Sequence, residues 1–372
     1  MSGPRPSTTG PAEGGRALRR FIVPGVFVTA VFVALFLRRP DDGDPGRLWT
    51  FAGPTMGTTW TVKVVPGDHP DTDQPAAEQA IIDALADVNG RMSTWLPDSE
   101  LSRFNDNPTV EPVPVSDDLR HVLREALRLS EVSGGAFDVT VGPLVNAWGF
   151  GPTDGGTPPT DAEVEALRPR IGYQRLTLDD DARTLRKAHP EMRVDLSAIA
   201  KGYGVDRASF ALDKLGYARY MVEVGGEVRA KGLNATGQPW QIGIEKPDEG
   251  ERAVQEVVPL RDMAMATSGN YRNFYEKDGK RLSHTIDPTT GHPVDHRLAS
   301  VSVFHPDCMT ADGWATTLNV LGEQRGYDLA VAQDVAALLL IKAPDGQFTE
   351  KVTPAFERMR EREREREGAA NR

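Results

Sequence analysis

The sequence contains a single cysteine, Cys308, among its 372 residues. One cysteine cannot close an intramolecular disulfide or build a cysteine-based zinc site. Clusters of lysine and arginine are also scarce, and the formal net charge is -11. Because nucleic-acid binding depends on concentrated positive charge, this balance argues against nucleic acid as a partner. No glycine pattern matches a Walker loop or a dinucleotide-binding fingerprint, so the two commonest nucleotide motifs are missing as well.

One long apolar run stands near the N-terminus, over residues 21–37. At about 1.5 Å per residue it spans roughly 25 Å, the short end of a membrane crossing. A cleaved signal peptide usually has a shorter apolar core and a small-residue cleavage site, which this run lacks. We therefore expect an uncleaved transmembrane anchor over 21–37, with a polar segment 1–20 before it and a linker 38–47 after it. The arginines on its two sides nearly balance, so the positive-inside rule does not decide the orientation.

Strand and helix patterns are mixed between residues 48 and 350, without a regular strand–helix repeat. Such a mixture is typical of the α+β class and predicts one large domain over 48–350. Apolar spacing and capping signals predict helices over 76–92, from Ser116 to Gly134-Gly135, after Thr160, over 197–216 and over 310–321. Strands are predicted over 60–65, 220–229 and 240–245. The tail 351–372 is rich in alternating glutamate and arginine, which is typical of a solvated helix or a disordered segment.

The stretch RVDLSAIAKGYG, residues 193–204, could bind an anion. Asp195 and Ser197 stand just before the predicted helix start, and Lys201 falls one turn inside it. Backbone N–H groups at a helix start favour an anion, and a lysine one turn in can reach a phosphate. The same pattern also fits an ordinary capped helix with a surface lysine.

The stretch MTADGWATTL, residues 309–318, could hold a cation. Asp312 and Thr316 are four residues apart and therefore share one face of a helix. A carboxylate and a hydroxyl offer only oxygen, which suits Mg²⁺ rather than zinc. Two ligands are too few for a site, so an Asp that complements the helix dipole and a packed threonine remain an alternative.

Two further groups of residues could take part in chemistry. His284 lies directly before the turn sequence Asp287 to Gly291, where it could act as a general base or serve as a hydrogen-bonded structural residue. Ala136-Phe137-Asp138 follows a glycine pair and could wall a flat ring or lie in the core. Gly225-Gly226 interrupts a strand pattern and marks a bulge or a close ligand approach.

Taken together, seven short stretches in this order resemble the ApbE family, the FAD:protein FMN transferases. The matching stretches are Met56-Gly57-Thr58, Met92-Ser93-Thr94, residues 99–105, Ala136-Phe137-Asp138, residues 195–201, residues 283–291 and Thr310-Ala311-Asp312. They span most of residues 50–320. The sequence differs from many members at Glu223 and Glu227, where Asn or Asp is expected.

The resemblance implies a two-lobed, T-fold-like α+β body with FAD in a cleft between the lobes. Residues implied to contact the flavin nucleotide are Met56, Trp95, Ala136, Phe137, Asp138, Asp195, Lys201, Ile286 and Ala315. Mg²⁺ would be held by Asp312, Thr316 and the main-chain carbonyl of Ala198, which supplies the third oxygen. His284 is our candidate for the base and Lys201 for the group that neutralises the phosphates.

The implied activity is transfer of FMN from FAD to a threonine hydroxyl of an acceptor protein, with release of AMP. Implied acceptors are FMN-binding redox proteins with a short Ser/Asp-Gly-Ala-Thr-like segment. The exported members of the family imply a single-pass membrane protein with its domain on the extracytoplasmic side. An FAD pyrophosphatase, in which water replaces threonine, and a non-catalytic FAD-binding protein are the alternatives.

Overall fold

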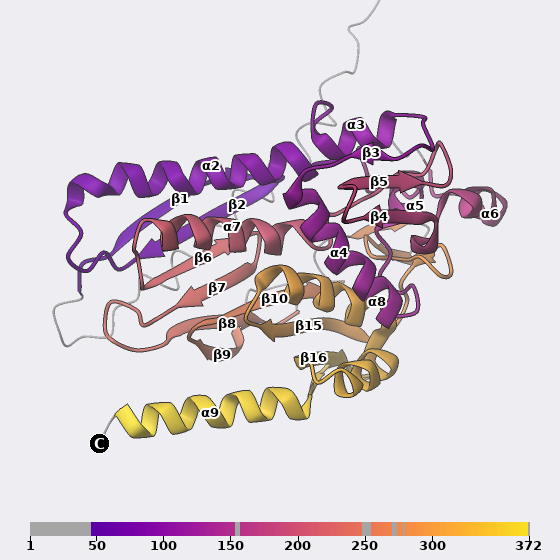
Figure 1. Ribbon diagram of the computed structural model, residues 1–372. Helices are drawn as coiled ribbons and strands as arrows, with labels where there is room; N and C mark the ends of the chain where they lie inside the picture. Colours follow the sequence, from indigo (N-terminus) through magenta and orange to yellow (C-terminus); the bar gives the residue numbers. More distant parts are fainter. Residues whose placement is uncertain (1–45, 153–156, 248–253, 270–273, 278–279, 371–372) are drawn as a thin grey trace, which may run out of the picture.

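The computed structural model describes residues 46–152, 157–247, 254–269, 274–277 and 280–370 (Figure 1). Its centre is an eight-stranded sheet in which every neighbouring pair is antiparallel. In their order across the sheet, the strands are β1 (Trp49–Thr55), β2 (Thr58–Val64), β6 (Tyr220–Val224), β7 (Glu227–Lys231), β10 (Met263–Gly269), β15 (Leu298–His305), β16 (Ala336–Lys342) and β17 (Phe348–Val352). The predicted mixture of helices and strands is thereby confirmed.

Three long helices cover one face of this sheet: α2 (Gln74–Met92), α7 (Ala200–Lys214) and α8 (Cys308–Ala332) (Figure 1). Side chains alternate between the two faces along each strand, so Val62, Val222 and Val224 all point to this face. There they pack with Ile81 and Leu85 of α2. Burial of these side chains is the main force that holds the helices to the sheet.

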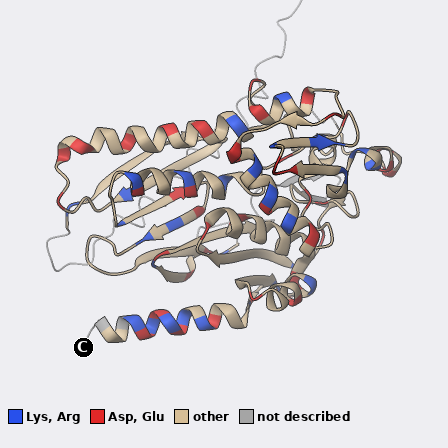
Figure 2. Ribbon diagram, viewed as in Figure 1, with Lys and Arg blue, Asp and Glu red and all other residues tan. Residues whose placement is uncertain are grey.

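The opposite face is covered by the hairpin of β8 (Trp240–Glu245) and β9 (Val254–Leu260), together with α9 (Pro354–Ala370). Phe356 of α9 is fully buried and packs against Phe304, with ring centroids 5.1 Å apart. Along the rest of α9, basic and acidic residues alternate (Figure 2). The charged tail therefore forms a helix that is attached by the Phe356 contact and by ion pairs of Arg358 with Asp334 and of Arg360 with Glu256.

A smaller lobe lies at the end of the sheet where α2 ends (Figure 1). It contains α3 (Glu100–Asp106), α4 (Asp117–Val132), α5 (Gly142–Ala147), α6 (Asp161–Leu167) and a small sheet of β3 (Val113–Pro114), β5 (Thr184–Lys187) and β4 (Leu176–Asp179). Between β10 and β15 the chain forms two short ribbons, β11 (Phe274–Lys277) with β12 (Lys280–Ser283), and β13 (Ile286–Asp287) with β14 (His292–Pro293).

Most predicted elements are found, and two predictions are wrong in detail. The hydroxyl of Ser116 accepts the N–H of Leu119 and begins α4, and Thr160 and Glu163 form the predicted capping box of α6. The predicted strand 220–229 is two strands, because Gly225 and Gly226 adopt φ of 60° and 106° and turn the chain back.

The helix predicted from residue 197 begins only at Ala200. The carboxylate of Asp195 accepts the N–H and the hydroxyl of Ser197, and this local turn competes with helix. Lys201 is consequently the second residue of α7. At the other end of the site, the helix predicted over 310–321 does break at Gly322, where φ is 78° inside α8.

The predicted segments 1–20 and 21–37 lie outside the described residues, as does most of the linker 38–47. Within the described ranges, none of the helices combines the length and apolar character that a membrane crossing requires.

Candidate active site

Two hairpin turns meet at one end of the sheet. Met56 and Gly57 connect β1 to β2 with φ of 47° and 71°, and the N–H of Gly225 in the β6–β7 turn donates to the carbonyl of Thr59 at 3.0 Å. Positive φ is uncommon for a methionine, so the turn holds Met56 in a strained conformation. Its side chain reaches α7, since a Cβ built on Gly204 would lie 3.0 Å from Met56 Cε.

Three charged side chains come together beside these turns. Lys201 Nζ lies 2.9 Å from Glu227 Oε1 and 3.5 Å from Asp312 Oδ1. The two carboxylates are almost fully buried, whereas the Lys201 side chain is 30% exposed. Burial opposes the charged lysine, but the carboxylates of Asp312 and Glu227 outweigh it and raise the pKa of Lys201. The ammonium is therefore charged throughout the physiological range and lies beside two buried carboxylates.

Burial acts on the carboxylates in the opposite sense. It raises the pKa of Glu227 above its ordinary value, and the nearby ammonium of Lys201 offsets part of that increase. A buried carboxylate beside one shared ammonium is costly to maintain without a further positive charge.

Asp312 is positioned by the start of α7. Its Oδ2 accepts the backbone N–H of Gly202 at 2.9 Å. The two helices approach so closely here that a Cβ on Gly202 would lie 2.4 Å from the carbonyl oxygen of Cys308 and 2.8 Å from Asp312 Cβ. Only glycine fits at this position, so Gly202 fixes the distance between Lys201 and Asp312.

The oxygens of the predicted metal ligands differ in how far they are already used in hydrogen bonds within the protein. Among the described residues, the carbonyl of Ala198 accepts no backbone hydrogen bond, and the N–H of Gly202, its partner in a regular helix, donates to Asp312 instead. Thr317 donates its hydroxyl to the carbonyl of Gly313, whereas Thr316 lies on the face of Asp312, one turn later.

These residues offer a carbonyl, a carboxylate and a hydroxyl, which is a donor set that suits Mg²⁺ with its remaining waters or phosphate oxygens. The described part of the chain contains no group of three or more His, Cys, Asp or Glu side chains arranged to hold a metal ion. The fit therefore depends on the mixed oxygen set of Ala198, Asp312 and Thr316.

His284 lies between β12 and β13 and is tied to α8 through its neighbour. The side-chain amide of Asn319 donates to the hydroxyl of Thr285 at 3.4 Å and to Ser268 at 3.1 Å. The half-buried ring of His284 meets that of Phe150 edge-on, with centroids 6.4 Å apart. Ile286, which follows, is 6% exposed. Thr285, which lies between the predicted base and the predicted flavin contact, is thus hydrogen-bonded to the helix that carries Asp312 and Thr316.

The aspartates of two other matching stretches, Asp138 and Asp195, form hydrogen bonds with nearby residues of the protein. Asp138 accepts from the N–H and hydroxyl of Thr140 at 2.8 and 2.6 Å and from the N–H of Tyr173 at 2.8 Å. Burial raises the pKa of Asp138, against the effect of these donors. The N–H of Asp195 donates to the carbonyl of Val139 at 2.7 Å, which joins the two stretches. Both carboxylates thus shape the loops in which they lie.

The remaining predicted contacts differ in exposure. Ala136, Phe137 and Ala315 are buried, whereas Trp95, in the loop after α2, is 65% exposed and free to stack on a flat ring.

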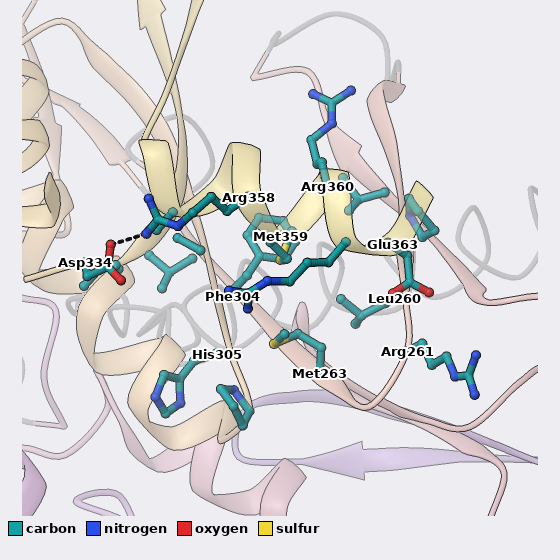
Figure 3. A pocket seen from close by; sticks show the side chains of 18 of the residues that line it. Leu260, Arg261, Met263, Phe304, His305, Asp334, Arg358, Met359, Arg360 and Glu363 are labelled. Atoms are coloured by element: carbon teal, nitrogen blue, oxygen red, sulfur yellow. Dashed lines mark hydrogen bonds and ion pairs between the residues drawn. The ribbon is translucent and has the colours of Figure 1, made fainter. Parts of the chain in front are cut away.

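The cavity of about 680 Å³ in Figure 3 is elsewhere, between α9 and the strands that carry Leu260, Met263 and Phe304. None of the predicted site residues lines it.

The sequence reasoning missed two residues that build this site. Asn105 exchanges two hydrogen bonds with the backbone of Val194, at 2.8 and 2.7 Å, and so holds the stretch that leads to Lys201. Glu227 was noted only as a departure from the family pattern. The sequence did contain a signal for Glu227, an acidic residue directly after the Gly225-Gly226 pair. A hairpin turn at these glycines brings the next residue back beside the preceding strand.

Comparison with known proteins finds close relatives of this chain. A family model described as the ApbE family matches residues 56–339. A relative from Vibrio cholerae named FAD:protein FMN transferase is 49% identical over 314 residues, which cover 84% of this chain and 92% of the relative. A relative of the same name from Haemophilus influenzae is 44% identical and covers 91% and 98%. The solved structure of the flavin transferase ApbE from Vibrio cholerae superposes with a TM-score of 0.77 at 47% identity, over 84% of this chain and 99% of that one.

Proposed function

The chain belongs to the ApbE family, and we infer that it is a transferase that moves FMN from FAD to an acceptor protein. The observation that carries the proposal in this chain is the cluster of Lys201, Glu227 and Asp312, together with the carbonyl of Ala198, which accepts no backbone hydrogen bond from the part of the chain that the structure describes. This cluster would offer one ammonium, on a partly exposed side chain, and a set of oxygens to the two phosphates of a dinucleotide.

We propose that Asp312, Thr316 and the carbonyl of Ala198 hold Mg²⁺. A bound Mg²⁺ would polarise the pyrophosphate and neutralise the charge that grows on the leaving phosphate. Lys201, whose ammonium lies 3.5 Å from Asp312, would add a second positive charge for the phosphates, and the buried carboxylates keep it protonated.

The chemical step is displacement at phosphorus. The hydroxyl oxygen of an acceptor threonine attacks the FMN-side phosphorus of FAD, the bond to the bridging oxygen breaks, and AMP leaves with that oxygen. The hydroxyl is a poor nucleophile until its proton is accepted, and we assign this role to His284. The proposal is supported by the hydrogen bond that joins the next residue, Thr285, to Asn319 of α8.

We propose that acceptors are FMN-binding redox proteins with a Ser/Asp-Gly-Ala-Thr-like segment, because the family resemblance implies them. The apolar run at residues 21–37 would anchor the enzyme in a membrane, with its domain on the extracytoplasmic side. Trp95, a large exposed aromatic, would stack on a ring of the dinucleotide.

The experiment that tests the proposal measures AMP release from FAD and Mg²⁺ with and without an acceptor domain. A transferase releases AMP in proportion to the acceptor present. Equal release in both reactions would identify an FAD pyrophosphatase, and FAD that stays intact for hours in both would identify a binding protein.

A further inference from the structure

Glu227 is the most deeply buried charged group of the site. It begins β7, its side chain is 3% exposed, and its Oε1 accepts from Lys201 at 2.9 Å. Its second carboxylate oxygen, Oε2, is buried with no hydrogen-bond partner among the described residues. A buried carboxylate with one unsatisfied oxygen destabilises the folded state, so a function in the site is needed to explain Glu227.

The position of Glu227 decides where the ammonium of Lys201 lies. The stem of Lys201 runs along the β6–β7 turn, since a Cβ on Gly225 would lie 3.3 Å from Lys201 Cδ. From there the ammonium can reach two carboxylates, and it lies closer to Glu227 than to Asp312, at 2.9 against 3.5 Å. Glu227 thus competes with Asp312 for the same cation.

We propose that Glu227 is a positioning residue that holds the ammonium of Lys201 away from Asp312, so that Asp312 can bind the divalent cation. The inference rests on the proposed function and adds a residue to it. Without the Glu227 charge, Lys201 would pair with Asp312 alone and occupy the carboxylate that the metal needs. Two carboxylates around one ammonium also leave a net negative charge, which attracts a dication.

The test measures binding of Mn²⁺, as a probe for Mg²⁺, to the purified protein without FAD or acceptor, by titration calorimetry. Glu227→Gln keeps the shape of the side chain and removes its charge. Its Mn²⁺ affinity should fall by about 10- to 100-fold, the range found when a group that supports a metal ligand is lost. Glu223→Gln, on the other side of the same turn, is the matched control and should change the affinity less than threefold or so, since Glu223 bonds to Gly226 rather than to Lys201.

A second variant separates positioning from a merely structural role. In the Glu227→Gln background, Lys201→Met removes the ammonium that would block Asp312, so the double variant should bind Mn²⁺ more tightly than Glu227→Gln alone. If Glu227 only supported the fold or ligated the metal itself, Lys201→Met would raise the affinity no more in this background than in the parent protein. Unfolding curves for all variants would establish that each is folded.

Two results would overturn the inference: an unchanged Mn²⁺ affinity in Glu227→Gln, or a gain from Lys201→Met that is no larger in the Glu227→Gln background than in the parent protein. Either result would leave the proposed transfer reaction standing, because binding is measured without FAD or acceptor. Conversely, Mn²⁺ binding with the predicted pattern in a protein that transfers no FMN would leave the positioning role intact and refute the proposed function.

Discussion

The N–H of Gly202 in α7 donates a 2.9 Å hydrogen bond to the carboxylate of Asp312 in α8, 110 residues further along the chain. This bond has two consequences for the site. It turns the N–H away from the carbonyl of Ala198, and it fixes Asp312 next to Lys201. A single contact between two helices therefore brings together two parts of the proposed metal site, the carbonyl of Ala198 and the carboxylate of Asp312.

The first prediction concerns this contact. Gly202→Ala should destabilise the protein by about 1–3 kcal/mol, because its Cβ would lie 2.4 Å from the carbonyl oxygen of Cys308. Gly90→Ala in α2 is the control, since a Cβ there meets nothing within 4 Å and should stabilise by about 0.5–1 kcal/mol. Urea unfolding measures both, and equal effects of the two substitutions would refute close packing at Gly202.

The second prediction concerns the cation. Asp312→Ala should lower the rate of FMN transfer by about 10²–10³-fold, because it removes the carboxylate of the proposed site. Chelation of divalent ions should stop transfer by the unsubstituted protein, and added Mg²⁺ should restore it. Transfer that continues at its normal rate in Asp312→Ala would show that the ligand assignment is wrong.

The third prediction concerns the base. His284→Ala should abolish most of the FMN transfer activity while FAD still binds. The reason is that His284 is proposed to accept the proton of the acceptor threonine and not to bind the dinucleotide. Flavin fluorescence titration measures the binding and AMP release measures the turnover. Near-normal turnover with bound FAD would rule His284 out as the base.

The fourth prediction concerns pH. Burial raises the pKa of Glu223 to about 7, above its ordinary value of 4.5. The folded state then holds this proton more tightly than the unfolded state, so stability contributed by the group falls as pH rises from about 4.5 to 7 and stays low above that. Glu223→Gln, which can still accept the N–H of Gly226, should be more stable than the parent by about 1–3 kcal/mol at pH 8 and similar at pH 4.5. A stability difference that is the same at both pH values would contradict the shifted pKa.

Elements with local signals were predictable from the sequence. The Thr160–Glu163 capping box and the Ser116 cap depend on residues three apart, and the break at Gly322 depends on one glycine. The start of α7 was missed because the turn of Asp195 with Ser197 competes with helix over only three residues.

The site was predictable only in part, for a different reason. Family motifs located Lys201 and Asp312, but the bond from Gly202 to Asp312 and those from Asn105 to Val194 join residues about 90 to 110 positions apart. No local pattern encodes such contacts, because they depend on how the helices pack. The contact of Glu227 with Lys201 was not predicted for the same reason. It forms only because the Gly225-Gly226 turn brings β7 beside α7.

The most direct test of the account is intact-protein mass spectrometry of an acceptor domain with a Ser/Asp-Gly-Ala-Thr-like segment, incubated with this protein, FAD and Mg²⁺. We predict a mass increase equal to FMN less one water, located on the threonine, with one AMP released for each FMN attached. An acceptor of unchanged mass, in a reaction that nevertheless converts FAD to FMN and AMP, would contradict it.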